Sequence, residues 1–289
     1  MTVYNVFSEQ VIFVGDLHGN FDTFLYWLKN FVPKNRAIVV CGDVGFGFHR
    51  PKYYNVKLEA INKFCEENDC TVFFIRGNHD DPQYFNGGNG DKTSFVTFEH
   101  VHAVKDYSCI HVWKENKVVH NILCVGGGIS IDRMLRMKQD INNAGLYARH
   151  AGLTLKEAVE KLNPTYWKDE PPTYDDEAMG LVKAEGTSVD VVCTHTCPSF
   201  VGLNDKEGLK VWMDGDPDLE GDLNHEREVM DEIWKRLKED GHTVTTWVYG
   251  HFHRHMYEEH DGVKFVMLDM CRTSTNKIDS FDLDGYGLQ

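Results

Sequence analysis

Residues 11–20 read VIFVGDLHGN, a pattern that returns at several points along the chain. Four apolar, largely β-branched residues predict a short buried strand that ends at a glycine. Asp16 and His18 follow this strand directly. Asn20 can then cap a helix, because apolar residues recur at helical spacing over 21–31. The stretch therefore predicts a strand, a polar turn and a helix in succession.

The same order repeats further along the chain. Residues 37–41 (AIVVC) and 71–75 (TVFFI) predict two more buried strands, and 53–68 predicts the helix between them. A β-α-β-α-β order of this kind favours a largely parallel sheet. Further strands are expected around 95–104, 109–113, 118–125, 189–194, 244–249 and 263–268, with a helix over 222–240.

Polar side chains come directly after five of these predicted strands. They are Asp16 with His18, Asp43, Asn78 with His79 and Asp80, His195, and His251 with His253. Each group alone is compatible with a turn, a helix cap or an ordinary strand end. Ligands of open α/β sheets bind outside the carboxyl ends of the strands, and carboxylate, amide and imidazole groups all bind divalent metals. Five such strand ends together therefore predict a metal site.

The last group lies in residues 248–255, VYGHFHRH, which follow an apolar run. If the strand continues through them, His251, His253 and His255 project from the same face, since alternate residues of a strand share a face. Polar histidines at a solvated strand end are the alternative interpretation of this stretch alone.

The full set of motifs resembles the calcineurin-like metallophosphoesterase superfamily. The order in that family is DxH, GD, GNH(D/E), a lone His and GHxH. All five blocks are present here, at 16–18, 42–43, 77–80, 195 and 250–253, with no ligand replaced. The resemblance spans about residues 11–253 and implies an α/β fold in which a central β-sandwich is flanked by helices.

The resemblance also implies roles for the motif residues. One divalent metal ion would be held by Asp16, His18, Asp43 and His253. A second would be held by Asp43, Asn78, His195 and His251, so that Asp43 bridges the two. Manganese is the expected metal, and iron, zinc and nickel fit the same ligands. His255 is outside the motif and is expected to be structural or at the rim.

The chemistry implied is hydrolysis of phosphomonoesters by a metal-bridging hydroxide. His79 would donate a proton to the leaving oxygen, and Asp80 would orient the His79 ring. A phosphodiesterase or nuclease is the alternative activity, and a non-catalytic scaffold of the same fold is the alternative from another class. Expected substrates are small phosphorylated compounds, nucleotides or phosphoproteins.

Three arginines are candidates for gripping a substrate phosphate: Arg76, Arg133 and Arg136. Surface salt bridges are the competing interpretation. The stretch 126–133, GGGISIDR, resembles a loop of small bacterial and phage metallophosphatases. Residues 76–79 resemble the RGNH block of protein serine/threonine phosphatases, but the Asp-Arg-Gly that those enzymes carry after the GD motif is missing.

Composition limits the partners, the cellular location and the domain organisation that we expect for the protein. The 289 residues carry a formal net charge of −15, which argues against long nucleic acid as a partner. Eight cysteines without a CxxC pair predict reduced thiols, and neither a signal peptide nor a membrane span is apparent, so a cytoplasmic protein is expected. We expect a single domain over 1–289, with 130–180 as a helical insertion or cap.

Overall fold

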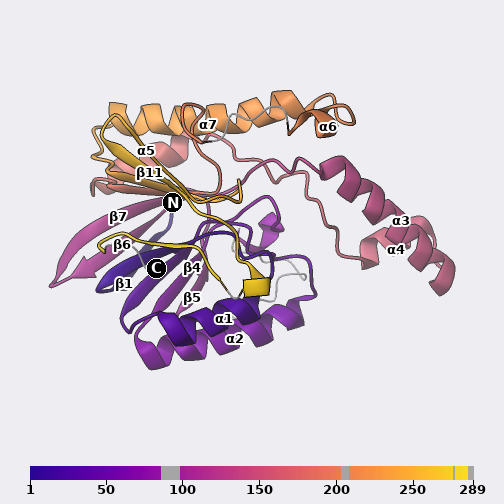
Figure 1. Cartoon of the computed structure of the whole chain (residues 1–289), viewed down its shortest axis with the longest axis horizontal. Helices are drawn as coiled ribbons and strands as arrows, with labels where there is room; N and C mark the ends of the chain where they lie inside the picture. The colour runs from indigo at the N-terminus through magenta and orange to yellow at the C-terminus, as the bar shows by residue number, and fades with distance from the viewer. Residues whose placement is uncertain (86–97, 203–207, 276, 286–289) are drawn as a thin grey trace.

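The computed structural model describes residues 1–85, 98–202, 208–275 and 277–285. Within these ranges two β-sheets lie face to face, and helices cover the outer side of each (Figure 1). The layers run helix, sheet, sheet, helix. This is the helix-flanked sandwich that the motifs imply.

The smaller sheet carries the first three motifs. Its strands run in the order β12 (Ser280–Asp282), β2 (Gln10–Val14), β3 (Arg36–Val40), β4 (Thr71–Phe74) and β5 (Val101–Ala103). β2, β3, β4 and β5 are parallel, as the strand and helix order predicts, and β12 is antiparallel to β2. Because β2, β3 and β4 run the same way, the polar residues after them meet at one edge. β5 is shorter than the strand expected there, of which residues 95–97 lie outside the described ranges.

The larger sheet carries the last two motifs. Its order is β1 (Val3–Phe7), β6 (Ser108–Lys114), β7 (Lys117–Val125), β8 (Val191–Thr194), β9 (Thr246–Tyr249), β11 (Val263–Met267) and β10 (Met256–His260). The pairs β6–β7 and β10–β11 are antiparallel, and the other neighbours are parallel. The parallel neighbours β8 and β9 therefore bring His195 and His251 to the same edge.

The helices divide between the two outer faces and a projecting arm. They are α1 (Phe21–Phe31), α2 (Pro51–Asn68), α3 (Arg133–Ala151), α4 (Leu155–Lys161), α5 (Asp176–Glu185), α6 (Lys210–Met213) and α7 (Leu219–Glu239), with short 3-10 helices at Pro82–Tyr84 and Thr273–Thr275. Helices α1 and α2 cover the smaller sheet, and α5 and α7 cover the larger. Helices α3 and α4 extend to one side of both sheets (Figure 1).

Apolar side chains from both sheets fill the space between them. Val11 and Phe13 of β2 join Ile110 and Val248 of the larger sheet in one cluster. The alternate residues of β2 face α1 and α2 instead. Strands buried on both faces read as continuous apolar runs, which is why these strands are visible in the sequence. Full burial of an aliphatic or Phe side chain contributes about 1.5–3 kcal/mol.

The strands β1, β10 and β12 are absent from those predicted, and each lies at an edge of its sheet. An edge strand needs fewer apolar residues, and β10 reads MYEEH with little of it buried. β1 pairs with β6 and β12 pairs with β2, and both of these neighbours are distant in sequence. In the described part of the chain, no helix combines the length and apolarity needed to cross a bilayer.

Candidate active site

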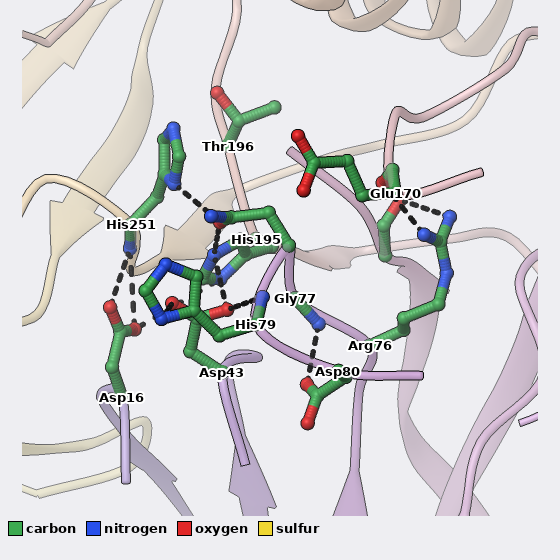
Figure 2. Close-up of polar contacts among 12 residues, drawn as sticks. Asp16, Asp43, Arg76, Gly77, His79, Asp80, Glu170, His195, Thr196 and His251 are labelled. Atoms are coloured by element: carbon green, nitrogen blue, oxygen red, sulfur yellow. Dashed lines mark hydrogen bonds and ion pairs between the residues drawn. The ribbon is translucent and has the colours of Figure 1, made fainter. Parts of the chain in front are cut away.

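The loops that follow five strands bring the predicted ligand residues together at one edge of the sandwich. Figure 2 shows Asp16, Asp43, His195 and His251 among them. Asp16 follows β2, Asp43 follows β3, and His195 follows β8. All three side chains are buried. Polar groups are normally buried only when they are paired or bind a ligand, so this concentration marks a functional site.

A first group consists of Asp16, His18, Asp43 and His253, which each offer a ligand atom within 4.8 Å of the others. The Nε2 atoms of His18 and His253 are 3.0 Å apart. His253 Nε2 lies 3.2 Å from Asp16 Oδ2, and His18 Nε2 lies 3.7 Å from Asp43 Oδ2. Two imidazoles and two carboxylates at these separations form a compact set of nitrogen and oxygen donors.

A second group shares Asp43 with the first. Asn78 Oδ1 lies 2.9 Å from His195 Nε2 and 3.0 Å from His251 Nδ1. Asp43 Oδ1 lies 3.3 Å from His195 Nε2, while its Oδ2 faces His18 of the first group. The structure thus brings all seven predicted metal ligands together, with Asp43 between the two groups.

The hydrogen bonds behind these residues aim their lone pairs into the site. His195 Nδ1 lies 2.8 Å from the carbonyl oxygen of Cys41, which leaves its Nε2 for the site. Asn78 Nδ2 donates to Ser130 Oγ at 2.9 Å, which leaves its Oδ1 for the site. Outer contacts of this kind orient metal ligands in proteins. The donor set fits a pair of borderline divalent metal ions.

Charge at the site is concentrated on Asp43. Burial would raise the pKa of Asp43, but the imidazoles of His79, His195 and His18 hold it well below its usual range. Burial likewise opposes the charged form of His195, yet Asp43 and Asp16 raise the pKa of His195 to about 10. Within the described residues, neither aspartate forms an ion pair with a lysine or arginine. Cationic partners of Asp16 and Asp43 themselves are therefore protons or metal ions.

The backbone of the ligand loops is unusual. His18, Asp43, His251 and His253 all have positive φ, from 46° to 70°. Strand β9 ends at Tyr249, so the side chains of His251 and His253 project from a loop with left-handed backbone and not from an extended strand. The prediction that three imidazoles share a strand face was wrong for this reason. His255 lies apart from the ligands and pairs with Asp279 at 2.8 Å.

Glycine is required where the motifs place it before a ligand. A Cβ on Gly77 would lie 2.1 Å from Asp43 Oδ1, and a Cβ on Gly250 would lie 2.1 Å from Asp16 Oδ1. No side chain fits at either position, because the backbone must approach the carboxylates this closely.

His79 lies beside both groups of ligands, between Asp43 and Arg136. Its Nδ1 is 3.8 Å from Asp43 Oδ2, and its Nε2 is 2.9 Å from a guanidinium nitrogen of Arg136. Burial lowers the pKa of His79 to about 4, helped by Arg136 and opposed by Asp43. The ring is therefore neutral near pH 7 and turns a lone pair toward the guanidinium.

Asp80 does not orient the His79 ring as expected. Its two oxygens accept hydrogen bonds from the backbone N–H groups of Val44, Gly45, Phe46 and Gly77, at 2.7–3.1 Å. Burial, with Asp43 nearby, raises the pKa of Asp80 to about 7. The carboxylate thus binds the loop after β3 to the loop after β4, and its effect on His79 is through the backbone.

Two of the three predicted substrate arginines are bound within the protein. Arg76 donates to the carbonyl of Glu170 at 2.7 Å and to Asp106 at 3.0 Å, away from the ligands (Figure 2). Arg133 forms a two-pronged contact with Asp216 and a further one with Asp222. Both side chains are buried and paired with aspartates, which corrects their assignment to substrate. Arg136 is the one of the three that lies at the site.

Two buried glutamates behind the site are outside every motif. Glu226 of α7 accepts from the Ile129 N–H at 2.6 Å and lies 3.6 Å from His251 Nε2. Glu170 accepts from the N–H and the hydroxyl of Ser130, and burial raises its pKa to about 8. Glu170 falls in an acidic stretch that reads as a solvated loop, and Glu226 in an ordinary amphipathic helix. The sequence carries no signal for either.

Comparison with solved structures finds distant similarity over most of the chain. A dimetal phosphatase from Danio rerio is 12% identical with a TM-score of 0.44, covering 92% of this chain and 88% of that one. A phosphopantetheinyl hydrolase from Mycobacterium tuberculosis is 15% identical with a TM-score of 0.38, covering 90% and 89%. A cold-active protein-tyrosine phosphatase from a Shewanella species is 14% identical with a TM-score of 0.33, covering 92% and 72%.

No curated protein matches the chain. The family model of the calcineurin-like phosphoesterases matches residues 10–255, a span that contains all five motifs and every residue of the two ligand groups. The chain therefore belongs to the calcineurin-like phosphoesterase family.

Proposed function

We propose that this protein is a metal-dependent phosphomonoesterase. The observation that carries the proposal is the pair of ligand groups joined at Asp43, with the His79–Arg136 pair immediately beside them. A phosphoryl group that contacted both ligand groups would lie within reach of an imidazole and a guanidinium. These are the groups that transfer of a phosphoryl group to water needs.

Two divalent ions are the proposed cofactors. Asp16, His18, Asp43 and His253 would hold one, and Asp43, Asn78, His195 and His251 the other. Manganese is the first candidate, followed by iron, zinc and nickel. When bound, such a pair supplies Lewis acidity and lowers the pKa of a coordinated water.

His79 and Arg136 act on the substrate side of the site in this proposal. The guanidinium of Arg136 faces His79 Nε2, where a phosphate oxygen would be a stronger partner for it. A bound phosphate dianion would also favour the protonated form of His79, which could then donate a proton to the leaving oxygen. Asp43 faces the other side of the ring and helps to position it.

Arg136 also bears on the choice between monoesters and diesters. A monoester carries two negative charges and a diester one, so an additional cation beside the reacting group favours the monoester. A phosphodiesterase or nuclease remains the competing activity. Small phosphorylated compounds, nucleotides and phosphoproteins are the substrate types that the site would accept.

The shared core supports treating residues 1–289 as a single domain, because one cluster of apolar side chains draws on both sheets. Residues 130–180 are proposed to form a cap. The arm of α3 and α4 is part of it, and α3 supplies Arg136. All eight cysteines are buried free thiols, which supports a reducing compartment such as the cytoplasm.

The test is a paired hydrolysis assay on the manganese-loaded protein, with p-nitrophenyl phosphate and bis-p-nitrophenyl phosphate, each with and without EDTA. We expect EDTA-sensitive hydrolysis of the monoester. Asp43→Asn should remove most turnover, His79→Ala should lower kcat by about 10²–10⁴-fold, and the exposed control Asp22→Asn should change little. Hydrolysis of the diester alone, or wild-type rates in both site variants, would overturn the proposal.

A further inference from the structure

A cleft of about 510 Å³ opens beside the ligand groups and is lined by two chemically different sets of residues. One set belongs to the polar site itself and includes Asp43, Asn78 and His79. Apart from Ile129, the large apolar lining residues are Ile131, Leu209, Trp212, Leu223 and Phe252. We call these five residues the apolar wall.

The apolar wall is assembled from separate parts of the chain. Ile131 lies just before α3, Trp212 on α6 and Leu223 on α7, one turn before Glu226. Glu226 lies near His251, so the same face of α7 serves the ligands and the cleft. The contacts of Arg133 with Asp216 and Asp222 hold these elements against one another.

Phe252 joins the wall to the ligands, because it lies between His251 and His253 in sequence. Its ring packs edge-on against those of His251 and Tyr249, and the Arg227 guanidinium lies 5.5 Å from its centre. These contacts hold the ring in place before any substrate enters. A rigid aromatic surface next to the reacting centre is suited to another flat ring.

Charge in the cleft argues against a substrate with several phosphates. Arg254 is the one lysine or arginine among the described lining residues, and Asp132 and Glu226 are also present. Beyond the reacting phosphate, the cleft offers little to hold further negative charge. An apolar group, in contrast, would gain by leaving water for this surface.

We propose that the apolar wall binds the leaving group of the substrate, and that this group is apolar and aromatic. The inference rests on the proposed function and narrows it to phosphomonoesters of aromatic alcohols. Trp212 is the residue expected to contribute most, because it is the largest side chain of the wall and is partly exposed in the cleft.

The experiment measures binding separately from turnover. Calorimetry on the manganese-loaded protein compares benzylphosphonate with methylphosphonate, neither of which can be hydrolysed. We expect benzylphosphonate to bind about 10-fold more tightly, and Trp212→Ala to abolish that preference without weakening methylphosphonate. Val211→Ala is the matched control, since Val211 precedes Trp212 on α6, is 78% exposed and does not line the cleft.

Turnover is then compared for benzyl phosphate and 2-hydroxyethyl phosphate, whose leaving groups are both simple alkoxides. The expected result is a higher kcat/KM for benzyl phosphate that Trp212→Ala removes. Equal binding of the two phosphonates, or equal loss of both in Trp212→Ala, would overturn the inference. Failure to hydrolyse any phosphomonoester would instead count against the proposed function, and the phosphonate comparison would still decide the role of the wall.

Discussion

Glu226 shows how a residue outside the motifs can govern a ligand inside them. His251 has Asn78 Oδ1 at 3.0 Å from its Nδ1 and Glu226 Oε1 at 3.6 Å from its Nε2. A carboxylate on the far nitrogen of a metal-binding imidazole fixes the ring and increases its basicity. Glu226 is therefore placed to strengthen metal binding without touching the metal.

Glu226→Gln should weaken manganese binding at the second ligand group by about 10–100-fold. The glutamine oxygen can still accept from the Ile129 N–H, so the thermal unfolding temperature should change little. Titration calorimetry with manganese measures the effect, and Glu232→Gln on an exposed position of α7 is the control. Equal affinities in all three proteins would rule out this role.

Single residues differ in how far the sequence reveals them. Each group of predicted ligands follows a buried strand, so motif and local structure together were enough to place Asp16 or His195 at the same edge. The prediction that Arg76 and Arg133 bind substrate was wrong because their partners are set by the tertiary fold. For Arg133 these partners are Asp216 and Asp222, which are distant in sequence. The sequence alone does not distinguish an arginine that binds a substrate from one that pairs with an aspartate.

At the scale of elements, Asp80 joins the loops after β3 and β4. Asp80→Ala would leave four buried N–H groups without an acceptor, and we expect the free energy of unfolding to fall by about 4 kcal/mol. His79→Ala, one residue earlier, should cost far less. Urea denaturation of the two variants compares them, and equal stabilities would contradict the role of Asp80.

A second contact between elements responds to pH. His120 on β7 lies 2.6 Å from Asp190, just before β8, and 3.1 Å from Asp284, which also pairs with Lys114. Burial opposes the charge on His120, but the two aspartates prevail and raise its pKa. Its stabilising effect is therefore complete below the unfolded pKa of about 6.5 and is lost as pH rises through the higher folded pKa.

His120→Gln should accordingly cost stability at pH 6, on the order of 1 kcal/mol, and less at pH 9. The measurement is urea denaturation of both proteins at the two pH values. His150→Gln, on an exposed position of α3, corrects for the general effect of losing a histidine. A difference that stays constant with pH would mean that the charge on His120 does not contribute.

Elements, too, were predictable to different degrees. The central strands appear as apolar runs because both of their faces are buried, while β1, β10 and β12 lie at edges and carry mixed sequences. The left-handed loop of His251 and His253 was not anticipated, because no sequence rule marks a left-handed histidine. Local patterns therefore locate the core strands, and tertiary pairing decides the edges and loops.

At the scale of the molecule, one buried arginine connects the arm of α3 and α4 to the layers of the sandwich. Arg133 begins α3 and is paired with Asp216 and Asp222, near and within α7. Removing it would leave Asp216 buried and unpaired, a change that costs about 3–5 kcal/mol. The arm would lose its principal charged contact with the body.

We expect Arg133→Met to lower the unfolding temperature and to expose 133–161 to limited proteolysis. Arg149→Met is the matched control, because Arg149 is an exposed residue of the same helix and donates a hydrogen bond to the Gly145 carbonyl within that helix. The variants are digested with chymotrypsin in place of trypsin, and mass spectrometry locates the first cleavage. Identical cleavage patterns in the two variants would show that the arm is held by other contacts.

The positive φ angles of His18, Asp43, His251 and His253 have a consequence for how such a protein can change over time. Each non-glycine residue in this conformation costs about 1–2 kcal/mol, so replacing His253 by glycine should relieve strain in the metal-free chain while deleting a ligand. At these positions stability then favours glycine, while the chemistry of the site favours the ligand residue. A lineage released from the need for catalysis would be expected to drift toward glycine or asparagine at these sites first, well before its core begins to change.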